Sequence, residues 1–126
     1  MKLVSPPEIS FLTALGVEAI GLLSSGNIDA LAERFGYALS YGRTPAAAIR
    51  EDLALCLSKI GAVSLALTPT QPSVAVKFFG PNDPPLLAVV ECLVLADNRA
   101  ELLVELVVTG DGSASYVTLE DISAAV

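Results

Sequence analysis

The stretch LLAVVECLVLA, residues 86–96, is the most apolar run of the chain and decides its fold. It is shorter than the roughly 20 residues that a membrane-spanning helix needs, and it carries Glu91 at its centre. A short apolar run of this kind predicts a strand buried in a sheet. Apolar or alternating runs lie on both sides of it, and we expect strands there too: Ala62–Leu67, Ser73–Phe79, Glu101–Thr109 and Tyr116–Leu119.

The segments between these runs contain turn-forming residues. Residues 69–72, 80–85, 97–99 and 110–112 hold Pro, Gly, Asn or Asp, and each is too short for a helical crossover between parallel strands. Neighbouring strands are therefore expected to be antiparallel.

The N-terminal half of the chain has helical periodicity instead. Ser5 and Glu8 have the spacing of a capping box, which predicts a helix from about Pro6 to Ser24. Asn27 is placed to cap a second helix, from Ile28 to about Phe35.

A third helix should begin at Thr44-Pro45 and end at Gly61. The preceding residues, 37–41, alternate in a way that predicts a short strand with Tyr37 and Tyr41 on one side, although an extension of the second helix is the alternative. Helices first and a meander afterwards indicate an α+β fold. We expect one domain over residues 1–126, with three helices covering one face of a curved antiparallel sheet of about five to six strands.

Composition excludes several classes of function. The 126 residues are 53% hydrophobic, enough for a core without metals or disulfides, and Cys56 and Cys92 are expected as small buried side chains. A net charge of -7, with no cluster of basic residues, argues against nucleic acid and anionic membranes as partners. The chain has no histidine, and we expect no metal and no cofactor. Its N-terminus lacks the pattern of a signal peptide, which predicts a soluble cytoplasmic protein.

The run GNIDALAERF, residues 26–35, is followed by a tyrosine-containing stretch and then by PAAAIRE, residues 45–51. This order resembles the superfamily of nuclear transport factor 2 and ketosteroid isomerase, to which SnoaL-like proteins belong. The later strands and the Asp97-Asn98-Arg99 hairpin are similar to it as well, so that the resemblance covers nearly the whole chain. It implies a cystatin-like cone, in which a strongly bent sheet wraps around a pocket and helices close the other side.

The resemblance also implies where an isomerase site would lie. The isomerase branch uses an aspartate base together with an oxyanion hole made of a tyrosine and a protonated aspartic acid. Aligned on the shared Gly26, the tyrosine position falls on Ala19 and the base position near Arg43, and neither residue can do that chemistry. The third position, counted back from the Asp97-Asn98-Arg99 hairpin, falls on Glu91. We therefore expect no complete catalytic set of this kind, and whether the chain is an enzyme stays open.

Four residues are candidates for ligand binding: Glu91, Glu105, Tyr37 and Tyr41. If Glu91 faces a pocket, burial should raise its pKa and leave a neutral donor, whereas a cross-strand pair with Lys77 would make it structural. The strand register decides in the same way whether Glu105 lines a pocket or the outer face. The two tyrosines could orient a ligand or serve as core residues.

Two other acidic residues are not expected to bind a ligand. Glu51 and Asp52 lie on the third helix away from its apolar stripe, and we expect them on the solvated surface.

Three functions fit these observations. The first is a small-molecule-binding domain of unknown ligand, with an apolar pocket. The second is an isomerase or dehydratase that uses Glu91 as acid or base, and the third is a dimeric protein-interaction module. Successive residues of a strand point to opposite faces of the sheet, and residues 86–96 and 101–109 carry apolar side chains for both faces. Helices in a chain of this size can cover only one face, so we expect a homodimer to cover the other.

Overall fold

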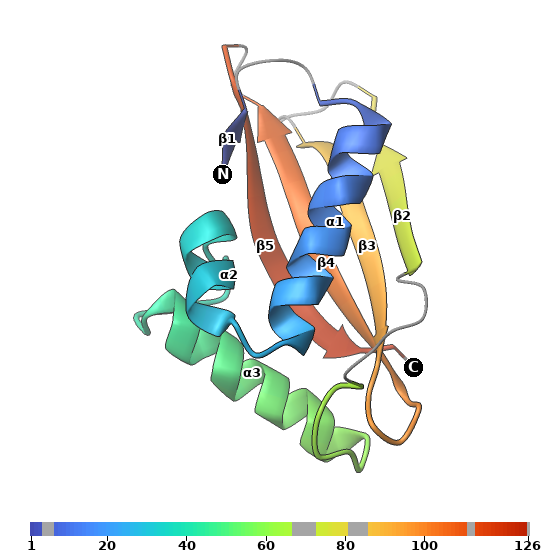
Figure 1. Cartoon of the computed structure of the whole chain (residues 1–126). Helices are drawn as coiled ribbons and strands as arrows, with labels where there is room; N and C mark the ends of the chain where they lie inside the picture. The colour runs from blue at the N-terminus through green and yellow to red at the C-terminus, as the bar shows by residue number, and fades with distance from the viewer. Residues whose placement is uncertain (4–6, 67–72, 81–85, 111–112, 126) are drawn as a thin grey trace.

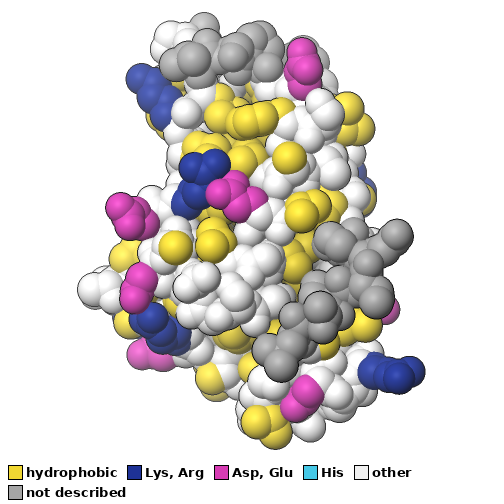
Figure 2. Space-filling view, viewed as in Figure 1, with side chains coloured by type: hydrophobic (Ala, Val, Ile, Leu, Met, Phe, Trp, Pro, Cys, Tyr) yellow, Lys and Arg dark blue, Asp and Glu magenta, His cyan; other side chains and the backbone are white. Residues whose placement is uncertain are grey.

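The computed structural model describes residues 1–3, 7–66, 73–80, 86–110 and 113–125. Three helices pack on one side of a single five-stranded sheet, so the expected α+β class is confirmed (Figure 1). The side of the molecule that carries the helices has basic and acidic side chains scattered among apolar patches (Figure 2). Within the described ranges, none of the helices is long and apolar enough to span a membrane.

The three expected helices are present as α1 (Ile9–Ser24), α2 (Ile28–Phe35) and α3 (Pro45–Lys59). Thr44 caps α3 as expected, because its Oγ1 accepts a hydrogen bond from the amide of Ala47 at 3.4 Å.

The two other predicted caps need correction. Helix α1 begins three residues later than expected, after Glu8, whose side chain makes no capping bond, and Ser5 and Pro6 lie outside the described residues. Asn27 occupies the N-cap position of α2 but does not cap it through its side chain, because its amide donates to Ser25 Oγ at 3.1 Å instead.

The sheet is antiparallel throughout, with strand order β1-β5-β4-β3-β2. The meander from β2 to β5 follows the prediction, although β5 extends five residues beyond the expected end at Leu119. Strand β1, at the very N-terminus, was not predicted. The strands are β1 (Lys2–Leu3), β2 (Ser73–Phe78), β3 (Leu86–Leu95), β4 (Glu101–Gly110) and β5 (Ser115–Ala124).

The strand expected over residues 62–67 is reduced to one isolated bridge, between Leu65 and Ala96, and Leu67 lies outside the described residues. Side chains of the β3–β4 turn bind this part of the chain instead. Asn98 Nδ2 donates to the carbonyl of Ile60 at 2.8 Å, and Asp97 Oδ1 accepts from the amide of Val63 at 3.2 Å. These bonds engage backbone groups that a sheet ladder would otherwise use.

The strand expected over residues 37–41 is a loop. Gly36, Tyr41 and Gly42 have φ values of 70°, 47° and 81°, which a regular strand does not accommodate. The amide of Ala38 still donates to the carbonyl of Leu119 at 2.9 Å, so the loop touches β5 without extending the sheet.

The hydrophobic core lies between the helices and one face of the sheet. Alternate residues of β3 and β4, such as Val90 and Leu106, are fully buried there against helix residues such as Leu12 and Ile49. Cys56 and Cys92 are buried free thiols, as expected, and burial raises the pKa of Cys92 to about 12. No cluster of three or more metal-ligating His, Cys, Asp or Glu side chains occurs in the described part of the chain.

Candidate protein-interaction surface

The second face of the sheet carries the residues that alternate with the core positions. The core residues of the three helices all pack on the other face. On this face the side chains of β3 and β4 are half-buried, whereas those on the helix side are buried. We call this surface the open sheet face. It consists of Ser73, Ala75 and Lys77 on β2, Val89, Glu91 and Leu93 on β3, Leu103, Glu105 and Val107 on β4, and Thr118, Asp121 and Ser123 on β5.

The strand register arranges these residues in three rows that run across the sheet. The valine row is Lys77, Val89, Val107 and Thr118, and the leucine row is Ser73, Leu93, Leu103 and Ser123. Between them lies the carboxylate row, Ala75, Glu91, Glu105 and Asp121. Two rows with apolar centres and polar ends therefore flank a line of three acidic side chains on adjacent strands.

Glu91 forms an ion pair at the β2 end of the carboxylate row. Lys77 Nζ lies 2.6 Å from Glu91 Oε1, and this hydrogen bond raises the pKa of Lys77. The lysine side chain is 65% exposed and the glutamate 28% exposed. This is the cross-strand pair that was the structural alternative for Glu91, and it places the carboxylate on the open sheet face rather than toward the helices.

Glu105 lies directly between two other carboxylates. Burial raises its pKa most, followed by the negative charges of Asp121, Glu91 and Glu120, while Lys77 lowers it. Among the residues that the structure describes, no basic side chain forms an ion pair with Glu105 or Asp121. Like charges directly opposite one another destabilise a sheet, so the row costs the isolated chain free energy.

Asp121 enters this row through an irregularity in β5. The register between β4 and β5 shifts between Glu105 and Leu106, which leaves Glu120 as an extra residue and brings Asp121 opposite Glu105. Asp121 was not among the predicted site residues because the last strand was expected to end at Leu119. An acidic pair at residues 120–121, just beyond a predicted strand, was the available signal.

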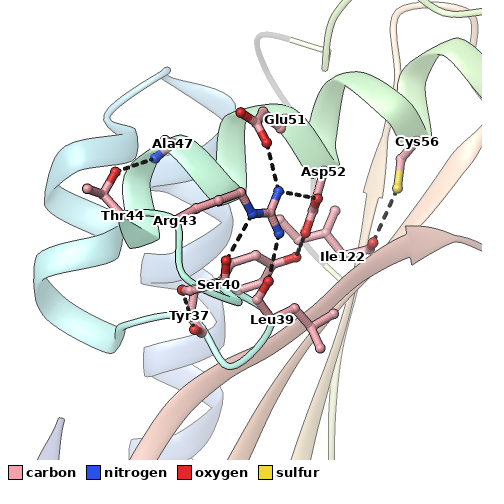
Figure 3. Close-up of polar contacts among 10 residues, drawn as sticks. All are labelled: Tyr37, Leu39, Ser40, Arg43, Thr44, Ala47, Glu51, Asp52, Cys56 and Ile122. Atoms are coloured by element: carbon pink, nitrogen blue, oxygen red, sulfur yellow. Dashed lines mark hydrogen bonds and ion pairs between the residues drawn. The ribbon is translucent and has the colours of Figure 1, made fainter.

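The two candidate tyrosines lie elsewhere, in the loop between α2 and α3, and they do not share a side. Tyr37 is buried, and its hydroxyl donates to Asp52 Oδ2 at 2.5 Å (Figure 3). Tyr41 is 80% exposed. The expectation that both would line one surface is therefore wrong, because the loop turns at Tyr41 and Gly42 with positive φ.

Arg43 holds this loop against α3. Its Nη1 lies 2.8 Å from Glu51 Oε2 and 3.1 Å from Asp52 Oδ1, while Nε and Nη2 donate to the carbonyls of Ser40 and Leu39 (Figure 3). The prediction that Asp52 lies on the solvated surface is wrong. The carboxylate instead accepts bonds from both Tyr37 and Arg43, and its side chain is only 20% exposed.

The charges in this cluster indicate a structural role. Burial raises the pKa of the Tyr37 hydroxyl, as does its hydrogen bond to Asp52. Burial also opposes ionisation of Asp52, but the hydrogen bonds from Tyr37 and Arg43 outweigh it and lower the pKa. A tyrosine that keeps its proton and a carboxylate that is already bonded to two donors are poor candidates for a general base.

The four candidate residues therefore fall into separate regions. Glu91 and Glu105 are neighbours on β3 and β4 of the open sheet face, whereas Tyr37 and Tyr41 belong to the loop before α3. No protein-family model matches the chain, and neither the curated proteins nor the solved structures yield a significant match.

Proposed function

We propose that this protein is an interaction module that binds a second copy of itself through the open sheet face. The observation that carries the proposal is the sheet face on which none of the described helices packs, with its valine and leucine rows. When one face of a sheet packs on helices, the other face can be exposed to water, but the side chains on an exposed face are normally polar. Here the central strands β3 and β4 carry Val89, Leu93, Leu103 and Val107 on that face.

The size of the open sheet face suits a dimer. Strands β3, β4 and β5 have 10 residues each. Strand β2 has 6 residues. At ~3.4 Å per residue and ~4.8 Å between strands, the four strands together cover roughly 590 Å². Stable protein interfaces bury about 600–1,000 Å² on each partner, so the face reaches the lower end of the area that stable association needs.

The helix-covered side supports an interaction module more than a ligand-binding domain. A pocket of the cone type would lie between the helices and the sheet, where fully buried side chains such as Ile20, Leu31 and Leu119 pack as core. Glu91 and Glu105, the acidic groups expected to orient a ligand, lie on the opposite face. The cystatin-like cone itself stays a proposal, supported by the curved antiparallel meander that follows three helices.

Analytical ultracentrifugation over a wide concentration range tests the proposal. We expect the native protein to be a dimer, and the double variant Leu93→Gln/Leu103→Gln to be a folded monomer. Both substitutions remove apolar contacts from the open sheet face without changing its charge. The matched control is Leu55→Gln/Val63→Gln, which changes side chains that are 62% and 86% exposed elsewhere, and it should remain dimeric. A native protein that stays monomeric up to millimolar concentration would overturn the proposal.

A further inference from the structure

The two outer edges of the sheet differ in how the chain covers them. At the β5 edge, Met1 exchanges two backbone hydrogen bonds with Val117. Further along this edge, the amide of Ala38 donates to the carbonyl of Leu119. Strand β2 forms the opposite edge (Figure 1). Within the described ranges, the backbone of β2 bonds to β3 alone, and its outer side has no partner.

The hydrogen-bond pattern determines which backbone groups of β2 face outward. The amide of Phe79 donates to the carbonyl of Leu87, and successive residue pairs of an antiparallel ladder alternate between bonding to each other and pointing away. The backbone groups of Val74, Val76 and Phe78 therefore point away from β3. Such a row of N–H and C=O groups is a template on which a further strand can pair.

Helix α1 lies beside this edge on the helix-covered side of the sheet. Its Gly16 packs closely on Val74 of β2 and Val90 of β3. On the other side of the helix, Glu18 pairs with Arg34 of α2 at 2.6 Å. Figure 1 likewise shows α1 between α2 and β2. The flank of α1 that faces away from α2 is therefore next to the outer edge of β2.

This flank is uncharged and partly apolar. Ile9, Thr13 and Val17 follow one another at intervals of four residues, which places them on one side of the helix. Ile9 is 59% exposed and Val17 is 43% exposed. The Thr13 hydroxyl donates to the carbonyl of Ile9 at 2.7 Å, and Glu18 is the single charged residue of α1. We call this flank, together with the outer side of β2, the β2 edge surface.

On the open sheet face, the same edge gives access to the carboxylate row. The row ends at Ala75, whose small side chain is exposed, and Glu91 is next in line on β3. Lys77 is already paired with Glu91, so the three carboxylates outnumber the basic side chains beside them. A residue of an added strand in line with Ala75 would lie about 10 Å, or two strand spacings, from Glu91. The long side chain of lysine or arginine can cross this distance toward the glutamate.

From these observations we infer that the β2 edge surface binds an extended segment of another protein, which joins the sheet as an additional strand. The segment has apolar side chains at alternate positions, which pack on α1, and a basic side chain between them, which faces Glu91. A second copy is a poorer complement, because Lys77, the basic residue of its β2, is engaged by its own Glu91. The inference goes beyond the proposed function, since it concerns a different surface and a different partner.

Fluorescence anisotropy with a synthetic peptide tests the inference. The probe is a labelled heptapeptide that alternates threonine with valine and has arginine in place of one inner threonine. Glutamate in place of the arginine should raise the Kd of the peptide by about tenfold or more, because it adds a carboxylate to the row.

A pair of helix variants tests the contact with α1. Val17→Lys should also raise the peptide Kd by about tenfold, because it places a charge against the apolar side chains of the added strand. The matched control is Ala14→Lys, which places the same charge at an exposed position on the solvent side of α1 and should bind as the native protein does.

Methylation of the peptide amides tests the strand pairing itself. In an antiparallel strand, the arrangement of all neighbours in this sheet, the residues opposite Val74, Val76 and Phe78 bond to β2, and in the probe these are the valines. N-methylation of the valines should abolish binding, whereas N-methylation of the residues between them should leave the Kd within about twofold. Equal effects of the two sets would show that no strand is added and would overturn the inference.

The outcomes separate the inference from the proposed function. Leu93→Gln/Leu103→Gln, which disrupts the open sheet face, should bind the peptide with native affinity. If the peptide does not bind up to millimolar concentration, the inference fails and the proposed function stands. If Val17→Lys instead lowers the number of subunits in the native assembly, a second copy occupies the edge, and the inference is overturned.

Discussion

At the scale of single residues, Gly16 sets the distance between α1 and the sheet. A Cβ atom at this position would lie 2.8 Å from Val74 Cγ1 and 3.1 Å from both Cys92 Sγ and Val90 Cγ1. These neighbours belong to β2 and β3, and the valines are stiff β-branched side chains that cannot swing away. The helix can therefore approach this closely only because residue 16 has no side chain.

Substitution of Gly16 by Ala should destabilise the fold by about 1–3 kcal/mol, the usual effect of overpacking a filled core. Gly21 on the same helix is the matched control. A Cβ atom there meets nothing within 4 Å, so Gly21→Ala should stabilise the protein by up to about 1 kcal/mol through helix propensity. Urea unfolding of both variants measures the two free energies. Equal effects of the two substitutions would show that α1 does not pack as closely as described.

The loop before α3 shows why the side chains Tyr37 and Asp52 were placed incorrectly from sequence. Each has an ordinary local pattern: a tyrosine in an alternating stretch, and an aspartate off the apolar stripe of a helix. Their hydrogen bond joins residues 15 apart, and Arg43 adds ion pairs to Glu51 and Asp52. Such contacts depend on tertiary packing and on the positive φ of Tyr41, neither of which periodicity reveals.

At the scale of secondary structure, the helices and the meander were largely predictable because their signals are local. Helix α3 has a proline at its first position and a threonine cap, and β3 and β4 are long apolar runs ended by a short turn. The predictions fail where two paired strands are far apart in the sequence or where their register shifts. The two-residue strand β1 exists only because β5 offers an edge to it, and the shift that brings Asp121 opposite Glu105 cannot be read from either strand alone.

The carboxylate row predicts how the stability of the sheet changes with pH. Burial and the neighbouring carboxylates raise the pKa of Glu105 in the folded state. The folded chain therefore holds this proton more tightly than the unfolded chain. The resulting contribution to stability is fully present below the unfolded pKa and is lost as the pH rises through the folded pKa.

Glu105→Gln should accordingly raise the free energy of unfolding at about pH 7 by roughly 0.2–1 kcal/mol, the size of one like-charge cross-strand contact. The gain should vanish at about pH 3, where the native carboxyl is protonated too. Glu101→Gln is the control, because Glu101 is exposed at the start of β4 and lies outside the row. Urea unfolding at the two pH values, at a protein concentration low enough for monomers, measures the free energy of unfolding of both variants and of the native protein. A loss of stability at neutral pH would contradict a repulsive row.

At the scale of the whole molecule, the same row couples the proposed association to protons. In a dimer formed through the open sheet face, as proposed above, the carboxylate row lies inside the interface. Association buries Glu105 further among Glu91, Asp121 and Glu120, and Lys77 is the one basic group that faces it. The dimer should therefore take up protons as it forms, and acid should strengthen it.

We expect the dimer Kd to fall between about pH 7.5 and about pH 5, by up to about tenfold per pH unit for each proton taken up. Glu105→Gln should bind more tightly at neutral pH and show a smaller pH dependence, because its amide stays neutral. Glu101→Gln changes the net charge of -7 by the same amount but should keep the native pH dependence, which separates the row from a general loss of charge repulsion. Sedimentation equilibrium across this pH range gives the slope of log Kd against pH for each protein. If Glu105→Gln retained the full native slope, proton uptake would belong to other groups, and the row would have no part in it.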